Sequence, residues 1–218
     1  MPEEPGSELA LDTLRLDSGA TLDVADGLCD TLLYVPSGSG AVGGAAFTGP
    51  AAVVVSAGDA AQLSATEATT AVRATVGGAT DLHAPMGTLE PVVVLEHVEP
   101  GTATGARSFQ VLHGPHNGST RATTFVGYIP PGRAPWHYHL YDEIVWVLRG
   151  SGRLHLGEDV EPLEPGCAFR LRPREVHIVE NTDPLDELAV LGIFTPAGSP
   201  SAAYLTPDVA ETYTITAS

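Results

Sequence analysis

The segment Gly132-Arg133-Ala134-Pro135-Trp136-His137-Tyr138-His139-Leu140-Tyr141-Asp142-Glu143 carries the strongest chemical signal in this chain of 218 residues. Side chains two residues apart on a strand project to the same face, so His137 and His139 point together toward whatever that face covers. Glu143 heads the next apolar run, and a hairpin or bend would bring its carboxylate beside the two imidazoles. His177 follows a segment punctuated by glycine and proline and completes a set of three imidazoles and one carboxylate.

Such a set suits a divalent transition metal, because neutral imidazole binds these metals and the carboxylate adds charge. Iron, manganese, cobalt, nickel, copper and zinc all fit this description. A His-x-His pair on its own is more often part of an ordinary exposed strand. The metal hypothesis therefore depends on the spacing of the whole set.

Two motifs in this region resemble those of the cupin superfamily. The first contains a glycine, a His-x-His pair, a glutamate and a second glycine, here Gly132, His137, His139, Glu143 and Gly150. The second contains a glycine, a proline, a histidine and an asparagine, here Gly166, Pro173, His177 and Asn181.

The sequence departs from the family pattern in two places. Four residues separate Gly132 from His137 where five are usual, and the turn from Pro173 to His177 is one residue short and lacks the usual glycine. The second departure concerns the geometry of the turn and not the position of His177, whose spacing to Asn181 is kept.

The resemblance implies an all-β fold made of double-stranded β-helix (jelly-roll) barrels, whose closed shape limits exposed edges and leaves an inner cavity. It also implies that the metal ligands are His137, His139, Glu143 and His177. We therefore expect one divalent transition metal per chain, with iron as the first choice and manganese, nickel, zinc, cobalt or copper as alternatives.

A short internal repeat indicates a bicupin, with two barrels in one chain. Residues 33–40 line up with residues 145–152 at an offset of 112, since both segments run from a strand into Gly-Ser-Gly. Downstream, residues 57–59 fall opposite residues 165–167 at an offset of 108. The positions opposite the four ligands are then Ala25, Gly27, Thr31 and Thr69.

None of these four residues can replace a metal ligand well. We therefore expect residues 1–88 to form a degenerate cupin barrel without metal ligands and residues 89–218 to form the metal-binding cupin barrel.

The rest of the chain also favours an all-β fold. The sequence has 24 glycines and 18 prolines, which leave little uninterrupted room for helices. Short apolar runs recur between Gly/Pro turns, a pattern typical of sandwiches and barrels. The expected strands are 31–35, 51–55, 91–97, 108–112, 122–129, 143–148, 152–156, 168–171 and 188–194. A short terminal helix is expected at Thr206-Pro207-Asp208, where the threonine can act as the N-cap.

Charge and hydropathy exclude some classes of partner. Asp and Glu number 27 against ten basic residues, all arginine, so nucleic acid and anionic membranes are poor partners for this surface. No run of about 18 apolar residues is present, and the N-terminal MPEEPGSELA carries acid where a signal peptide would carry base. We therefore expect a cytoplasmic protein. Cys29 and Cys167 are expected to be small buried hydrophobic residues rather than a disulfide pair.

Aromatic and basic residues near the motifs are candidates for the walls of the cavity. Two of six aromatic residues are expected to face it: Phe125, Tyr128, Trp136, Tyr138, Tyr141 and Trp146. Arg170, Arg172 and Arg174 share one face of an extended segment, and we expect that face to point outward. An inward Arg170 or Arg172 would instead bind a substrate carboxylate.

The neighbouring acids and the remaining histidines have simpler interpretations. Asp142, Glu175 and Glu180 could each accept the second ring N–H of a ligand histidine, although surface acids are common on an acidic protein. His155 is an alternative pocket residue. Structural or solvated roles are expected for His83, His97, His113 and His116.

Three classes of function fit these residues. The resemblance favours an oxidoreductase, namely an oxygenase or dioxygenase that uses O2 to oxidise a small organic molecule in the C-terminal barrel. The same ligands would serve a redox-neutral isomerase, cyclase or hydrolase. The fold alone does not exclude a small-molecule-binding protein without catalytic activity, but the intact ligand set argues against that class. The resemblance is also compatible with a homodimer formed through an exposed sheet.

Overall fold

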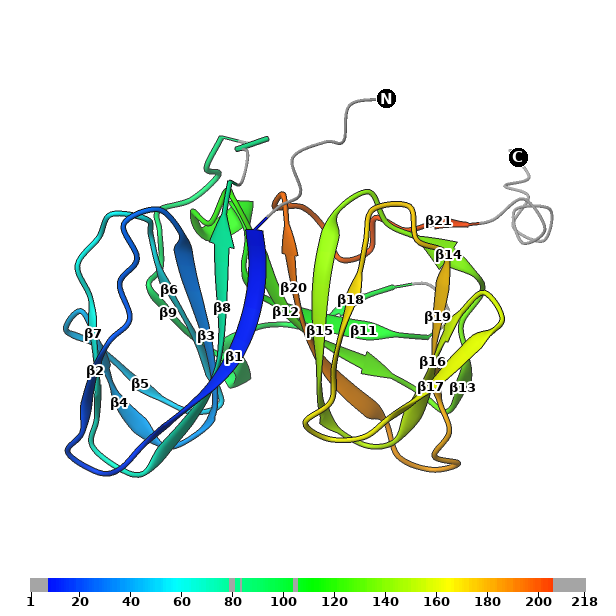
Figure 1. Ribbon diagram of the computed structural model, residues 1–218, viewed down its shortest axis with the longest axis horizontal. Coiled ribbons are helices and arrows are strands. Elements are labelled where there is room, and N and C mark those ends of the chain that lie inside the picture. Colours follow the sequence, from blue (N-terminus) through cyan, green and yellow to red (C-terminus); the bar gives the residue numbers. More distant parts are fainter. Residues whose placement is uncertain (1–7, 79–80, 83, 104–105, 206–218) are drawn as a thin grey trace.

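The computed structural model describes residues 8–78, 81–82, 84–103 and 106–205. These residues form two β-barrels that lie side by side (Figure 1). The helices among them are two short 3-10 turns, η1 (Leu95–His97) and η2 (Pro115–Asn117), and no helix in this part of the chain is long and apolar enough to cross a membrane. The expected terminal helix at residues 206–208 lies outside the described residues.

The first barrel is made of two antiparallel sheets. The larger has the order β1 (Glu8–Leu16), β8 (Thr69–Gly77), β3 (Asp30–Ser37), β6 (Ala51–Val55) and β9 (Val92–Val94). The smaller has the order β2 (Thr21–Asp23), β7 (Gln62–Ala65), β4 (Ser39–Val42) and β5 (Ala45–Thr48). β9 follows residue 88 in sequence, so this barrel also takes a strand from the segment assigned to the second one.

The second barrel repeats this arrangement with longer connections. Its larger sheet has the order β10 (Gly101–Thr102), β11 (Ser108–His113), β12 (Thr123–Ile129), β20 (Leu188–Thr195), β15 (Asp142–Arg149) and β18 (Ala168–Leu171). Its other sheet has the order β17 (Asp159–Leu163), β16 (Gly152–Leu156), β19 (His177–Asn181), β14 (His137–Tyr138) and β21 (Tyr204–Leu205), and β13 (Gly132–Arg133) also pairs with β19.

Apolar side chains on alternate positions of the same strands form three cores. In β3, Leu33 and Val35 fill the first barrel, whereas Leu32 and Tyr34 point out toward the second. β15 does the same, because Val147 lies inside its barrel while Ile144 packs in the shared core. Such strands are buried on both faces, which explains their unbroken apolar runs.

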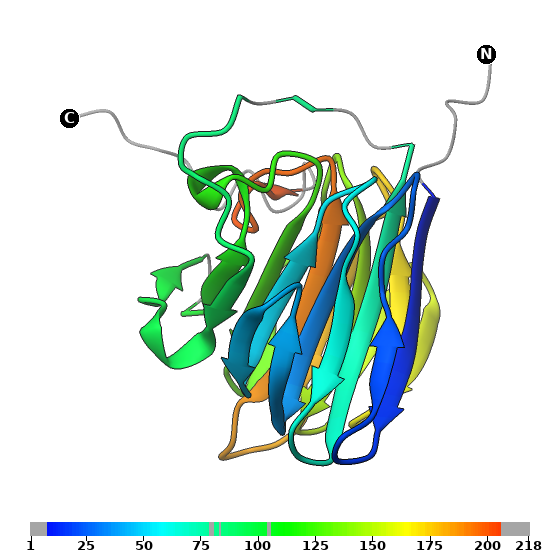
Figure 2. The same cartoon turned by 90° about the vertical axis from the view of Figure 1, so that its left-hand side faces the viewer.

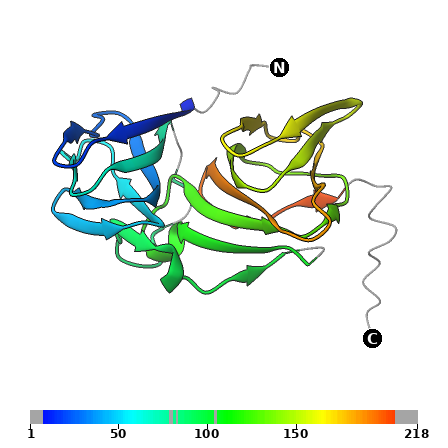
Figure 3. The ribbon, with the colours of Figure 1, turned by 90° about the horizontal axis from the view of Figure 1, so that it is seen from below.

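The large sheets of the two barrels therefore pack against each other, and the buried side chains between them form one shared hydrophobic core. This shared core draws Val54 and Val76 from the first barrel and Val126 and Leu191 from the second. Figure 2 shows the blue and cyan strands of the first barrel in front of the orange and yellow strands of the second, and Figure 3 shows the two barrels from below.

All nine expected strands are present within a few residues of their expected bounds. The segment 91–97 is shorter as a strand than expected, since β9 ends at Val94 and η1 follows it. Two of the strands that were not expected lack an unbroken apolar run: Asp12 and Arg15 interrupt the leucines of β1, and β8 is mostly threonine and alanine.

The internal repeat is confirmed at its first landmark. β3 runs into β4 through Gly38 and β15 runs into β16 through Gly150, and both glycines have positive φ, at 103° and 85°. Since the strand order β1-β8-β3-β6 matches β12-β20-β15-β18, the two barrels have the same topology.

The second landmark of the repeat was wrong. Gly40 pairs with Ala65 and its counterpart Gly152 pairs with Asn181, so residues on β7 and β19 correspond at an offset of 116. The residue opposite His177 is then Ala61 and not Thr69. The Gly166 turn joins β17 to β18, and the equivalent turn of the first barrel joins β5 to β6. The offset of 108 instead placed Gly166 opposite Gly58, which lies in the next connection, between β6 and β7.

Candidate metal centre

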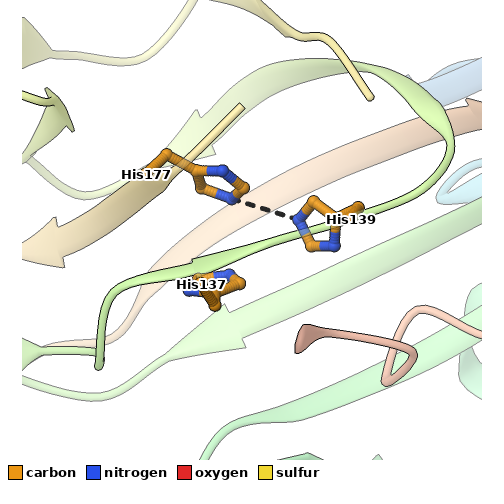
Figure 4. Close-up of side chains that lie close together, drawn as sticks. All are labelled: His137, His139 and His177. Atoms are coloured by element: carbon orange, nitrogen blue, oxygen red, sulfur yellow. Dashed lines mark hydrogen bonds between the residues drawn. The ribbon is translucent and has the colours of Figure 1, made fainter. Parts of the chain in front are cut away.

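Three histidines from two strands and a loop converge inside the second barrel. His137 lies in β14 and pairs directly with His177, the first residue of β19. His139 follows His137 by two residues, and one ring nitrogen from each of the three lies within 4.8 Å of the others (Figure 4). All three side chains are buried. The expectation that these residues come together is confirmed.

Backbone carbonyls orient two of the rings. His137 Nδ1 donates to the Pro135 carbonyl oxygen at 2.9 Å, and His177 Nδ1 donates to the Glu175 carbonyl oxygen at 2.8 Å. Each bond places the proton on Nδ1 and leaves the Nε2 lone pair available to a ligand in the barrel. The carboxylates of Asp142, Glu175 and Glu180 do not perform this role: they bind Arg170, the backbone N–H of Arg172 and His155.

The surroundings keep the three imidazoles neutral. Burial lowers the pKa of His139 to about 2 and that of His177 to about 3, and it also lowers the pKa of His137. Neutral imidazole is the form that binds a metal. His139 Nε2 lies 3.1 Å from His177 Nε2, and His139 Nδ1 is buried without a hydrogen-bond partner among the described residues.

These observations fit a bound cation. With Nδ1 of His177 protonated, His139 Nε2 is the donor in this contact. A metal would be held by the Nε2 atoms of His137, His139 and His177, and the His139 proton would then move to Nδ1. The donor set suits a divalent transition metal, because it combines imidazoles with a nearby carboxylate.

Glu143 supplies that carboxylate at the start of β15. Its Oε2 lies 3.6 Å from His139 Nε2, and the side chain is only 4% exposed. Burial, with a smaller effect from Asp142, raises the pKa of Glu143 to about 8. Burial thus disfavours the ionised carboxylate, and a cation beside it would stabilise that form. Its direct coordination of a metal stays a prediction.

Gly192 on the neighbouring strand β20 makes room for this carboxylate. A Cβ at this position would lie 2.8 Å from Glu143 Oε1 and 2.2 Å from the Phe125 ring. A side chain at this position would therefore force the Phe125 ring and the Glu143 carboxylate to shift.

The turn before His177 is adapted to the absence of a glycine. Arg174 has φ 66°, the left-handed conformation for which glycine is usually selected. Its backbone N–H donates to the His139 carbonyl oxygen at 2.7 Å. This hydrogen bond ties the turn that carries His177 to the segment that carries the other two histidines.

The histidines line a cavity of about 210 Å³. Three of the six aromatic candidates face it, one more than expected: Phe125, Tyr128 and Tyr141. Tyr141 stacks on His139 with ring centroids 4.6 Å apart and on Phe194 at 3.8 Å. The other three aromatic side chains pack elsewhere, against His155, Tyr204 and the shared core.

The arginine that lines this cavity is Arg107, which the sequence did not single out. Arg170 instead pairs with Asp142 and reaches the Leu9 carbonyl of the first barrel, as expected for an outward side chain. Arg107 lies far from both motifs in sequence, and only the pairing of β11 with β12 brings it to the cavity.

The remaining histidines and cysteines have structural or surface positions. His155 binds Glu180 at 2.7 Å and does not line the cavity, and His113 is fully buried with Nε2 3.0 Å from the Glu90 carbonyl oxygen. His97 and His116 are exposed, and His83 lies outside the described residues. The expectation for the cysteines was half wrong: they form no disulfide, but Cys167 is exposed and Cys29 is partly exposed.

The described residues form no comparable site in the interior of the first barrel. Its counterparts of the ligand positions are Ala25, Gly27, Thr31 and Ala61, which offer no strong metal ligand. The barrel is filled instead by apolar side chains, among them Leu33, Val53, Leu63 and Phe47. Among the described residues, the three histidines of the second barrel are the one cluster of metal-binding type.

Comparisons with known proteins agree with this architecture. The profile of the family described as "Cupin domain" matches residues 124–194, which contain all four predicted ligands. No curated protein matches the chain in sequence.

Similar solved structures include oxalate decarboxylase of Bacillus subtilis at pH 4.6, with a TM-score of 0.72, 14% identity, and coverage of 96% of this chain and 75% of that one. A second structure of that enzyme, concerned with its Mn(II) centres, matches with a TM-score of 0.71, 15% identity, and coverage of 90% and 71%. A putative glyoxylate-induced protein of Pseudomonas aeruginosa matches with a TM-score of 0.71, 16% identity, and coverage of 91% and 78%.

At such low identity these likenesses concern the fold, and together with the matched cupin profile and the histidine cluster they lead to one conclusion. Residues 124–194 match the cupin domain family, and the chain as a whole has the two-barrel fold of the bicupin structures that it resembles.

Proposed function

We propose that this protein is a metal-dependent oxygenase that oxidises a small organic molecule inside the second barrel. The observation that carries the proposal is the convergence of three buried neutral imidazoles and one buried carboxylate on a mostly apolar cavity. Such a set would hold one divalent transition metal, with iron as the first choice and manganese as the nearest alternative.

A bound metal of this kind would supply open coordination positions at which O2 and the substrate can meet. The protein's own residues do the rest. His137 and His177, fixed by their carbonyl partners, set the direction of two ligand bonds. Glu143 adds a negative charge that lowers the net charge of the centre.

The walls of the cavity serve to position the substrate and to exclude water. Phe125, Phe109, Val145 and Val190 present apolar surface beside the histidines. A small apolar molecule would bury its surface there, and a dry site strengthens the electrostatic interactions of the bound metal with its ligands.

The experiment is O2 uptake by the metal-loaded protein against a panel of small aromatic and keto substrates, with CO2 release followed in parallel. We expect O2 uptake that depends on both substrate and metal and is lost in His139→Ala. Substrate conversion without O2 uptake would replace the oxygenase with a redox-neutral metal enzyme, and metal binding without any conversion would favour a binding protein.

A further inference from the structure

Arg107 places a positive charge in the wall of the same cavity as the three histidines. It immediately precedes β11, and Phe109, two residues later, also lines the cavity. The guanidinium reaches the carbonyl oxygen of Val179, another residue of the cavity wall. The cavity therefore combines a cation and an aromatic ring at the start of β11.

The guanidinium has few partners. Arg107 donates from Nη2 to the Val179 carbonyl oxygen at 3.1 Å, and no carboxylate among the described residues forms an ion pair with it. The ion pairs Arg170–Asp142 and Arg149–Glu187 of the same barrel show that other arginines there do have acidic partners. A guanidinium has five N–H donors, so most of the hydrogen-bonding capacity of Arg107 is available.

This cation is half-buried. Desolvation lowers the pKa of Arg107 to about 10, so the side chain is still protonated at neutral pH. A charge withdrawn from water is costly unless it is paired. A half-buried arginine at the wall of a cavity, without an acidic partner among the described residues, is therefore a site prepared for an anion.

The charges of the cavity lead to the same requirement. Glu143 is the one carboxylate among the described residues that line the cavity, and its negative charge would be neutralised by the proposed metal. A divalent cation, Glu143 and Arg107 together leave a net positive charge, which an anionic ligand would balance.

The size and polarity of the cavity limit what the rest of this ligand can be. The volume is about 210 Å³, and away from the histidines the walls are apolar, with Phe109, Phe125, Ile129 and Val190 among them. A polymer or a sugar phosphate would bury polar groups against these walls without partners. A compact molecule with one charged end and an apolar body fits both regions.

We propose that the substrate is a small organic acid whose carboxylate is bound by Arg107 while its aromatic or short aliphatic body packs against Phe109 and Phe125. The inference depends on the proposed function only in assuming that this cavity is the substrate site. Arg107 acts as a specificity-determining residue, because its planar fork can hold both carboxylate oxygens at once.

The test compares acids with their matched amides, which have nearly the same shape but no charge. Calorimetric titrations of the purified protein would use benzoate against benzamide and hexanoate against hexanamide. The variants are Arg107→Met, which removes the charge, and Arg107→Lys, which keeps the charge without the fork. Arg153→Met, on the exposed side of β16, is the matched control.

We expect the parent to bind at least one acid about tenfold more tightly than its amide. Arg107→Met should weaken acid binding by about 10- to 100-fold, the usual effect of losing a hydrogen bond to a charged group, and should leave amide binding within about threefold. Arg107→Lys should give an intermediate loss, and Arg153→Met should behave like the parent. Metal content, measured in every variant, should be unchanged.

Equal binding of acids and amides by the parent, no binding of any acid in the series, or an unchanged preference in Arg107→Met would each overturn the proposal. If Arg107→Met does not fold by far-UV circular dichroism, Arg107→Lys and Arg107→Gln give the same comparison. An acid preference that depends on Arg107, found in a protein that takes up no O2, would refute the oxygenase and leave this inference standing.

Discussion

His137 and His177 lie directly opposite each other across the β14–β19 pair, with their ring centroids 4.4 Å apart. Their separation in sequence is 40 positions, yet backbone pairing alone fixes the distance between their Cα atoms. Both rings are held by carbonyl oxygens two residues earlier in the chain. Strand register and local turns therefore position both rings.

Removal of a ligand histidine should abolish metal binding without unfolding the protein. His137→Ala and His139→Ala each delete one nitrogen donor from a cavity that lies away from the shared core. We expect metal content to fall at least tenfold, while far-UV circular dichroism keeps its all-β form. Elemental analysis checks this against His97→Ala and His116→Ala, whose exposed side chains should not affect metal content. Parent-like metal content in both ligand variants would refute the site.

Gly192→Ala should damage the centre through crowding. The new methyl group would meet both the Phe125 ring and the Glu143 carboxylate at less than a normal contact distance. Overpacking of this kind costs about 1–3 kcal/mol, and it should also displace Glu143 and lower metal affinity. Urea unfolding and metal titration measure the two effects.

Gly198→Ala is the matched control. Its added methyl would lie 3.9 Å from the Phe194 ring, an ordinary contact distance, and the backbone of Gly198 is not in the left-handed region. Equal stability and metal affinity in the two glycine variants would contradict the crowding argument.

Arg174 should be replaceable by glycine at little cost. Its φ of 66° is strained for a residue with a Cβ, so Arg174→Gly should be neutral or stabilising by up to about 1 kcal/mol. Arg174→Val should be destabilising by more than about 1 kcal/mol, because a β-branched residue tolerates this conformation poorly. Thermal unfolding of the two variants and the parent measures these differences. A valine variant as stable as the glycine variant would show that the backbone at position 174 is not strained.

His113 should make stability depend on pH below neutrality. Burial lowers the pKa of His113 to about 4, whereas the ordinary value is 6.5, so below pH 6.5 the unfolded chain binds a proton that the native protein does not. The free energy of unfolding should therefore fall as the pH drops from 6.5 toward 4, by at most about 1.4 kcal/mol per pH unit from this group. Above pH 6.5 both states are neutral, and the contribution is constant.

His113→Gln keeps a side-chain N–H that can donate to the Glu90 carbonyl but removes the titration. Urea unfolding from pH 5 to 8 should show a shallower acid slope in this variant than in the parent. Parallel pH profiles would mean that His113 does not contribute.

The sequence allowed the histidine cluster to be predicted because its parts are local. The His-x-His pair, the glutamate four residues after it and the Pro-to-His turn are readable as short patterns, and the structure brings the three histidines together as expected. Strands buried on both faces, such as β6 and β20, were found in advance as continuous apolar runs. Strands such as β8, rich in alanine and threonine, gain their stability from pairing with β1 and β3 and carry little signal of their own.

What the sequence did not predict depends on long-range pairing. The role of Arg107 follows from the register of β11 against β12 and from its hydrogen bond to Val179, 72 positions away. The misplaced second landmark of the repeat has a similar cause, because a glycine turn is common and only strand pairing identifies which turn is equivalent. Ring orientation by backbone carbonyls was also missed, since any residue can supply a carbonyl.

The most direct test of the central claim is the number of transition-metal atoms bound per chain. Elemental mass spectrometry of untagged protein, prepared without chelator and reconstituted with iron or manganese, should give close to one per chain. The variant His137→Ala/His139→Ala/His177→Ala should give close to none. Two equivalents per chain in the parent, none after reconstitution, or one equivalent retained in the triple variant would contradict a single metal centre in the second barrel.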